Sequence, residues 1–179
     1  MMNFTSRCPS IINRMQLRKC IALLGEEYNS LPYHIYLYKD RLELEIEMHE
    51  APNMLEDSYN TILGNEVAVP IGICLDDIQM IKIFPFNLDD IEIDVIKCKI
   101  IWYVFHEIRH AWQNSTHIYT EDNIDLNPEN IKEYYEHESE RDANSFADKM
   151  YSSNVEHILR ILEVNRGIMI DSKSFYRHK

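Results

Sequence analysis

The chain has 179 residues, of which 45% are hydrophobic and 27% are charged. This composition is sufficient for one domain with a substantial core, and the absence of any apolar run of about 18 residues disfavours a membrane-spanning protein. The formal net charge of −12 disfavours a sequence-independent grip on nucleic acid, because that affinity comes mostly from Lys and Arg side chains on phosphates. We therefore expect one domain over residues 1–179, with neither a membrane nor a nucleic-acid partner.

The N-terminal residues and the cysteines indicate in which cellular compartment the protein resides. Residues 1–10 contain no charged segment followed by an apolar one, so we expect no export signal. No Cys-x-x-Cys occurs, which disfavours a zinc ribbon and a disulfide framework. We predict a cytoplasmic protein with four reduced thiols, at Cys8, Cys20, Cys74 and Cys98.

The first predicted elements are a helix and a hairpin. Apolar residues recur at helical spacing over residues 10–28. Residues 33–38 and 41–48 are then predicted as two strands joined at Lys39-Asp40, because Leu, Ile and Met alternate with Glu in the second of them. That strand is expected to have one dry and one acidic face.

A loop with Pro52 and Gly64 is predicted to lead to a second strand pair, over residues 66–74 and 78–84, with its turn at Asp76-Asp77. Pro and Gly in the first of these strands are typical of an edge or a bulge. An edge strand can receive an extended peptide as an added strand. We therefore expect this pair to form the upper wall of a cleft.

The next predicted helix carries a chemical motif. No Pro or Gly occurs between Asn87, its expected N-cap, and Ser115. Residues 100–105 are all apolar, as in a helix that crosses the middle of a domain, although a buried strand fits them too. The residues that follow, His106-Glu107-Ile108-Arg109-His110, match H-E-x-x-H.

On a helix, this spacing stacks the imidazoles of His106 and His110 so that both can hold a zinc ion. Glu107 is turned by about 100° around the helix, which makes it a candidate general base for a water molecule at the metal rather than a ligand. The alternative is a metal-free buried helix, in which the histidines bond to the core and Glu107 pairs with Arg109 or another cation.

A zinc site needs a third protein ligand. Metzincins place a His six residues after the second His, but that position holds Thr116 here. A second helix is predicted from Asn127 as N-cap and Pro128 at its first position through Tyr151, and it offers a Glu instead.

Two registers on this helix are possible, Glu138 with Asp142 or Glu140 with Asn144, each pairing a ligand with a polar residue one turn later. Glu140 projects about 70° and Glu138 about 130° from the predicted core face. The smaller angle favours Glu140 as the third ligand, with Glu138 as the alternative. The Glu-rich run 133–140 also fits a purely solvated face. The residues taken as the core face are Ala143, Phe146, Ala147 and Met150.

The H-E-x-x-H motif and the later segment Glu-Arg-Asp-Ala-Asn-Ser-Phe-Ala, residues 140–147, resemble the ImmA/IrrE family of zinc-dependent metallopeptidases. The resemblance covers roughly residues 100–150. It implies His106, His110 and Glu140 as zinc ligands, Glu107 as catalytic base and Asn144 as a residue that orients a ligand.

The chain departs from that family in three places. Ala111-Trp112-Gln113 is not the usual continuation of the motif. Arg109 stands where the family has the Gly of His-Glu-Leu-Gly-His, and Asp142 stands where it has a second Glu. We therefore expect a distant, gluzincin-like relative. The resemblance also implies an intracellular protein substrate, such as a DNA-binding regulator.

The remaining elements are a loop over residues 116–127 and a last helix over residues 154–166, with Gly167 just past its end. The loop is expected to border the cleft, where His117 or Tyr119 is a candidate for stabilising an oxyanion.

The sequence therefore predicts an α+β, zincin-like single domain, with a small antiparallel or mixed sheet within residues 30–86 and zinc-bearing helices within residues 88–152. The predicted function is a zinc-dependent metalloendopeptidase that acts on an intracellular protein or peptide. Three alternatives are a catalytically inactive zinc-binding interaction module, a metal-free helical scaffold and a SprT-like protease. The SprT-like protease would need a third His and a DNA anchor, which the sequence does not display.

Overall fold

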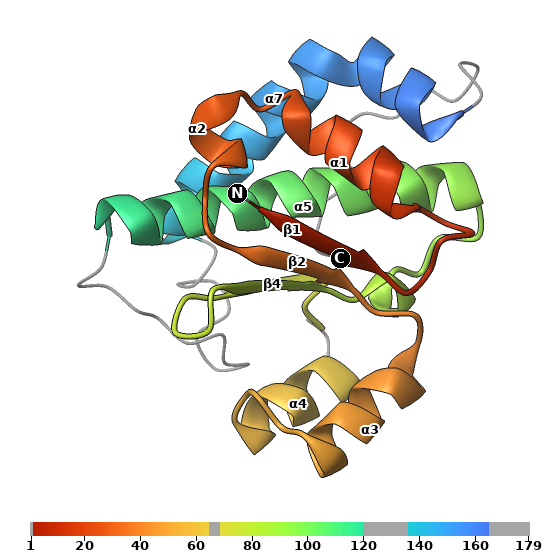
Figure 1. The fold of residues 1–179 in the computed structure, drawn as a ribbon, viewed down its shortest axis with the longest axis vertical. Coiled ribbons are helices and arrows are strands. Elements are labelled where there is room, and N and C mark those ends of the chain that lie inside the picture. Colours follow the sequence, from red (N-terminus) through yellow and green to blue (C-terminus); the bar gives the residue numbers. More distant parts are fainter. Residues whose placement is uncertain (1, 65–68, 120–135, 165–179) are drawn as a thin grey trace.

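A mixed four-stranded sheet carries helices on both faces in the computed structural model, which describes residues 2–64, 69–119 and 136–164 (Figure 1). The spatial order of the strands is β1-β2-β4-β3. β1 and β4 run parallel to β2, whereas β3 is antiparallel to β4. Because β1 and β3 lie at the ends of this order, they are the two edge strands of the described sheet. The predicted α+β class with a small mixed sheet is confirmed. The strands are β1 (Asn3–Ser6), β2 (His34–Leu37), β3 (Gly72–Leu75) and β4 (Met80–Ile83).

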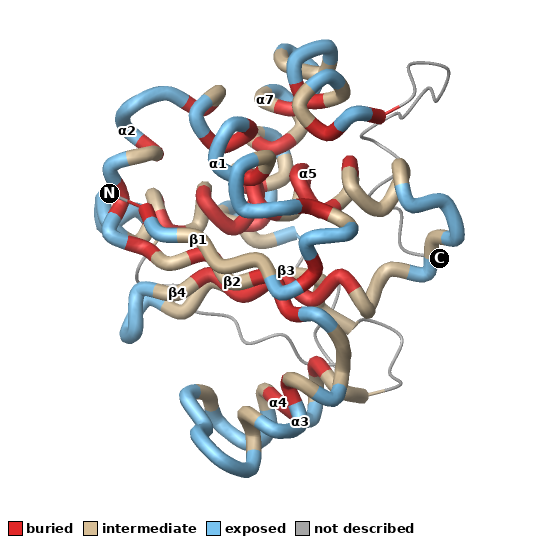
Figure 2. Tube along the Cα trace, turned by 45° about the vertical axis from the view of Figure 1, so that its right-hand side comes forward, coloured by how far each residue is buried: buried red, intermediate tan, exposed pale blue. Residues whose placement is uncertain are grey.

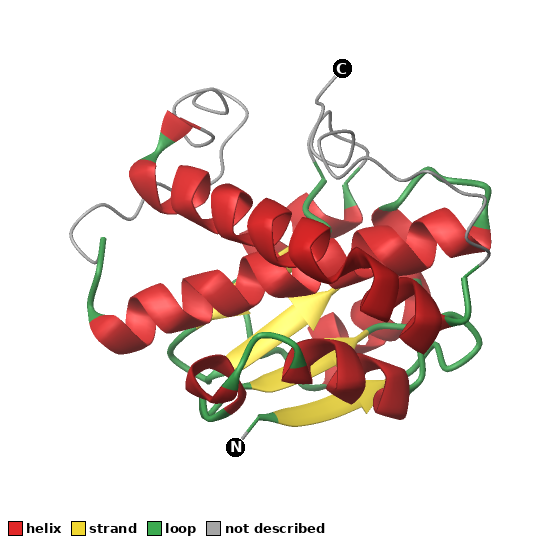
Figure 3. Cartoon of the chain, turned by 90° about the horizontal axis from the view of Figure 1, so that it is seen from above, coloured by secondary structure: helices red, strands yellow, loops and turns green. Residues whose placement is uncertain are grey.

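The described helices form two unequal layers. Helices α1, α5 and α7 lie on one side of the sheet, and α3 and α4 lie on the other (Figures 1 and 3). The helical bounds are α1 (Arg14–Ala22), α2 (Glu26–Asn29), α3 (Arg41–Glu50), α4 (Glu56–Leu63), α5 (Ile93–Thr116) and α7 (Glu138–Leu162), with a 3-10 helix η1 (Pro85–Asn87) before α5. Among the described residues, no helix is long and apolar enough to cross a membrane.

The alternation of side chains along the strands creates two cores. Ile35 and Leu37 of β2 belong to the larger core, together with buried residues of α1, α5 and α7. Tyr38 follows β2 and belongs to the smaller core with Leu44 of α3 and residues of α4. Buried chain is concentrated along α5 and the strands that it covers (Figure 2). The sheet therefore separates two apolar layers.

The predicted first helix is shorter than expected. α1 begins at Arg14 because Asn13 forms a capping box with Gln16. It ends at Ala22, and Gly25, with φ +90°, separates it from α2. Strand β1, which precedes α1, was not predicted because its four residues lie in a segment without clear alternation.

The predicted strand over residues 41–48 is wrong, and so is the hairpin that contained it. These residues form α3, because the Asp40 side chain accepts a hydrogen bond from the Glu43 amide and caps a helix there. Leu44 is buried while Leu42 is 61% exposed, so the alternation did not mark one buried face. The predicted loop before Gly64 is likewise wrong, since it contains α4.

The β2 strand and the β3–β4 hairpin with its turn at Asp76-Asp77 are confirmed. The strand predicted over residues 66–74 begins only at Gly72, and residues 66–68 lie outside the described residues. The predicted N-cap at Asn87 is wrong. Asn87 lies in η1, where its side-chain amide donates to the carbonyl oxygens of Ile62 and Pro70, and α5 begins six residues later.

The predicted break after Tyr151 is also wrong, because α7 continues without interruption to Leu162. Asn154 does not cap a new helix; its side chain donates to the Met150 carbonyl within α7. The predicted helix start at Asn127 and Pro128, and the predicted end before Gly167, lie outside the described residues.

Candidate metal centre

Helix α5 brings the H-E-x-x-H motif into the interior. It is buried on most sides between the sheet and α7, as its apolar residues 100–105 predict. α7 packs beside it (Figure 3), and the small Ala143 and Ala147 of α7 are fully buried, which allows a close approach of the two helices. His106, Glu107 and Glu140 are consequently 8%, 5% and 5% exposed.

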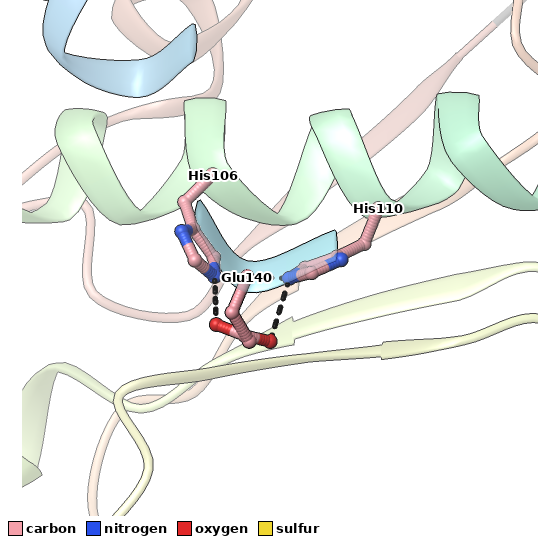
Figure 4. Close-up of side chains that lie close together, drawn as sticks. All are labelled: His106, His110 and Glu140. Carbon is pink, nitrogen blue, oxygen red and sulfur yellow. Dashed lines mark hydrogen bonds and ion pairs between the residues drawn. The ribbon is translucent and has the colours of Figure 1, made fainter. Parts of the chain in front are cut away.

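Three side chains converge between these helices (Figure 4). The Nε2 atoms of His106 and His110 are 3.0 Å apart, and Glu140 places Oε2 at 3.4 Å from the first and Oε1 at 3.1 Å from the second. Ligand atoms of a tetrahedral zinc ion, at about 2.0–2.1 Å from the metal, lie roughly 3.3 Å from one another. This donor set therefore fits a single metal ion.

The electrostatics of the group favour an anionic Glu140. Burial would raise the pKa of Glu140, but hydrogen bonds and charge from His106 and His110 lower it well below its usual range. Burial would likewise lower the pKa of His110, but the hydrogen bond to Glu140 and its charge raise it to about 9. Without a metal, the two groups form an ion pair that a cation must replace.

Glu107 lies beside the group and against the edge strand. A Cβ atom added to Gly72 of β3 would lie 2.7 Å from both Cγ and Oε1 of Glu107, so the glycine leaves the space that the carboxylate occupies. Burial raises the pKa of Glu107, while the nearby imidazoles act in the opposite direction. A buried carboxylate of this kind is a stronger base than an exposed one.

The structure distinguishes the two registers on α7. Glu140 is buried and joins the histidines, whereas Glu138 is exposed in the first turn. Asn144 is half-buried, and among the described residues no hydrogen bond joins it to either histidine. His117 is exposed at the C-cap of α5, and Tyr119 is half-buried. Their predicted roles, and that of Asn144, stay predictions.

One residue that contacts the group was missed by the sequence analysis. The Gln113 side chain, 2% exposed, lies with Oε1 at 2.9 Å from Nδ1 of His110. Two signals were available. Gln113 follows His110 by three residues, which is a contact distance on a helix. The departures from the ImmA/IrrE pattern at Arg109 and Asp142 are of opposite charge, and the structure joins these two side chains in an ion pair.

His106 is held differently. Its ring stacks on Trp102 with centroids 5.6 Å apart and planes inclined by 26°. Trp102 donates from Nε1 to Asp148 of α7 at 3.0 Å. Nδ1 of His106 is buried and has no hydrogen-bond partner among the described residues. The two histidines therefore differ in what orients their rings.

Comparisons of the chain with models of known protein families, with curated proteins and with solved structures found no match.

Proposed function

We propose that this protein is a zinc-dependent endopeptidase that hydrolyses peptide bonds of an intracellular protein. One observation carries the proposal. The Nε2 atoms of His106 and His110 and the Glu140 carboxylate converge at zinc-ligand spacing, with the buried Glu107 beside them. A purely structural site has no need of an additional buried carboxylate.

The donor set indicates zinc among the common metals. Two imidazoles and one carboxylate are the ligands of known catalytic zinc sites, whereas Ca²⁺ and Mg²⁺ take oxygen ligands almost exclusively. When bound, zinc supplies a Lewis acid that lowers the pKa of water and polarises a carbonyl group. His106, His110 and Glu140 would hold it.

Glu107 is the residue that moves the proton. Its carboxylate takes a proton from the attacking water and then returns it to the leaving amine of the cleaved peptide. Burial raises the pKa of Glu107, which suits both halves of this transfer. Its side chain is confined by the backbone of Gly72, so its position is defined before a substrate arrives.

The edge strand β3 is the proposed substrate contact. It lies next to α5 and, among the described strands, pairs with β4 alone, so its other side is the proposed position of an extended peptide. A peptide added there would run beside Gly72, the residue that touches Glu107. By resemblance to the ImmA/IrrE peptidases, the proposed substrate is a regulator such as a repressor.

The test compares the wild-type protein with Glu107→Gln. We expect about one zinc ion per chain in both, measured by elemental analysis. Cleavage of a peptide library, followed by mass spectrometry, should be at least about 10²-fold slower in the variant, because a general base contributes 10²–10⁴-fold.

Three results would overturn the proposal. No zinc in the wild type after zinc is supplied would leave a metal-free scaffold. Zinc in both proteins with cleavage by neither would indicate a non-catalytic zinc module. Equal cleavage by both proteins would remove Glu107 from its assigned role.

A further inference from the structure

The Gln113 side chain is oriented by partners that accept hydrogen bonds but cannot donate them. Its Nε2 lies 2.8 Å from Oδ2 of Asp142 and 3.0 Å from the carbonyl oxygen of Ser139. An amide nitrogen is the only end of the side chain that satisfies a carboxylate and a carbonyl together. The amide oxygen is therefore turned toward His110.

This orientation selects one form of the His110 ring. Because the amide oxygen only accepts, Nδ1 of His110 must carry the hydrogen of their 2.9 Å contact. In a neutral imidazole, Nε2 then has a free lone pair, and this atom faces Glu140 and His106. Gln113 thus selects the form of His110 whose Nε2 can bind a metal ion.

The Asp142 carboxylate is itself fixed by Arg109. The guanidinium donates from Nε to Oδ2 at 2.7 Å and from Nη2 to Oδ1 at 3.2 Å, a bidentate pair. Arg109 also donates to the Tyr28 hydroxyl at 2.6 Å and lies 3.9 Å above the Trp112 ring. The pair joins α5 to α7, the two helices that supply the ligands.

We propose that Gln113 is the positioning residue of His110, and that the Arg109–Asp142 pair holds Gln113 in its working orientation. The proposal rests on the metal centre of the proposed function but not on hydrolysis. It gives a role to Arg109 and Asp142, two of the positions that depart from the ImmA/IrrE pattern. Nδ1 of His106 has no such partner among the described residues. The hydrogen bond that orients a ligand ring from the side away from the metal position is therefore the one at His110.

The test measures zinc affinity of the full chain by competition with a chromophoric chelator, and the absorption bands of the cobalt(II) form. Gln113→Leu should weaken zinc binding about 10–100-fold, the usual effect of losing the partner of a ligating histidine. The cobalt bands should shift, because the ring of His110 is released. Asp142→Asn should weaken binding in the same direction by less. The double variant should fall short of the sum of the two free-energy changes, since both act through one contact.

Gln16→Leu is the matched control. Gln16 accepts a hydrogen bond from the Asn13 amide and donates to the Ile161 carbonyl, so its loss also removes two hydrogen bonds. It lies on α1, outside the metal group. This control should lower thermal stability and leave zinc affinity and the cobalt bands unchanged.

The outcomes separate this proposal from the proposed function. Zinc binding by Gln113→Leu within about twofold of the wild type, or an equal loss in Gln16→Leu, would overturn it. If Gln113→Leu does not fold, an unchanged zinc affinity in Asp142→Asn would overturn it instead. A wild-type chain that binds neither metal defeats both proposals. A wild-type chain that binds zinc but cleaves nothing defeats only the peptidase.

Discussion

The molecule buries two clusters of charged side chains, one on each face of the sheet. The metal cluster comprises His106, His110 and Glu140, with Glu107 beside them, under α5. The lysine cluster surrounds Lys82 of β4 on the α3–α4 side and contains Glu47, Asn53, Tyr38 and Tyr59. The two clusters differ in how their polar atoms are arranged. In the metal cluster, three ligand atoms converge on one point, whereas in the lysine cluster the acceptors surround an ammonium group of the chain itself.

The lysine cluster satisfies itself. Lys82 is fully buried and donates to Glu47 at 2.5 Å and to Asn53. Glu47 also accepts from the hydroxyls of Tyr38 and Tyr59, at 2.6 and 2.8 Å. Burial lowers the pKa of Lys82, while Glu47 opposes this change. The ammonium group has two oxygen acceptors and lies over the rings of Tyr38 and Tyr59, so the cluster balances the buried charge with its own residues.

The metal cluster does not close in the same way. Its two Nε2 atoms lie 3.0 Å apart and both face one carboxylate, so without a metal the cluster depends on the proton that the charged His110 shares with Glu140. A metal ion would take the place of that proton between the three ligand atoms. Convergence of ligand atoms on one point therefore distinguishes a candidate metal site from a buried charge that is balanced by its neighbours.

The largest effect should come from breaking the convergence. Zinc content should fall from about one ion per chain to nearly none in His110→Ala and in Glu140→Ala, because two donors hold the ion too weakly to survive purification. Glu138→Ala is the control and should keep its zinc, since Glu138 is exposed outside the group. Elemental analysis measures all three. Loss of zinc with Glu138 instead of Glu140 would contradict the assigned register.

A smaller effect should come from breaking the self-satisfied cluster. Glu47→Gln leaves the Lys82 charge buried without its counter-charge, and this should lower the free energy of unfolding by about 3 kcal/mol. Denaturant unfolding measures the change, and zinc affinity should not move, because the cluster lies across the sheet.

Glu43→Gln is the matched control for that substitution. Glu43 pairs with Arg7, whose side chain is 59% exposed, and also accepts from the Tyr36 hydroxyl and the Lys39 amide. The same chemical change should cost less than in Glu47→Gln, because Arg7 stays in contact with water whereas Lys82 does not. Equal losses in the two variants would mean that burial of Lys82 adds nothing to the cost.

At Gly72 of the edge strand β3, the expected loss of stability is no larger than at the lysine cluster. Gly72→Ala pushes a methyl group against Glu107, which should cost about 1–3 kcal/mol. The displaced base should slow peptide cleavage about 10²-fold while zinc content stays constant. Gly25→Ala is the control, because its strain comes from a φ of +90° with no atom within 4 Å, so it should lose stability and keep activity. A Gly72→Ala protein with full activity would contradict the placement of Glu107.

The parts of the fold that sequence predicted are those with a local signal. The α5 motif, strand β2 and the β3–β4 turn have apolar runs or turn residues that few other structures accommodate. The helix α3 was misread because Leu and Glu are good helix formers, and alternation alone cannot outweigh a capping Asp40. The sequence contains both the alternating pattern and the capping residue, but it does not show which of the two decides the structure.

The candidate site was predictable to the same degree. The spacing of His106 and His110 and the angular position of Glu140 follow from helical geometry, and the structure brings these residues together. Gln113 was missed because its contact with His110 depends on Asp142 and Ser139 of another helix. A relation between two helices is decided by packing, which one sequence does not contain.

The burial of two carboxylates at one site also sets a charge balance. Glu107 and Glu140, each 5% exposed, together contribute two negative charges when ionised, and neutral imidazoles contribute none. A divalent cation would make this interior region electrically neutral, whereas a monovalent ion would leave a buried negative charge that costs several kcal/mol. The site would therefore discriminate among ions by valence before coordination geometry discriminates among the divalent metals.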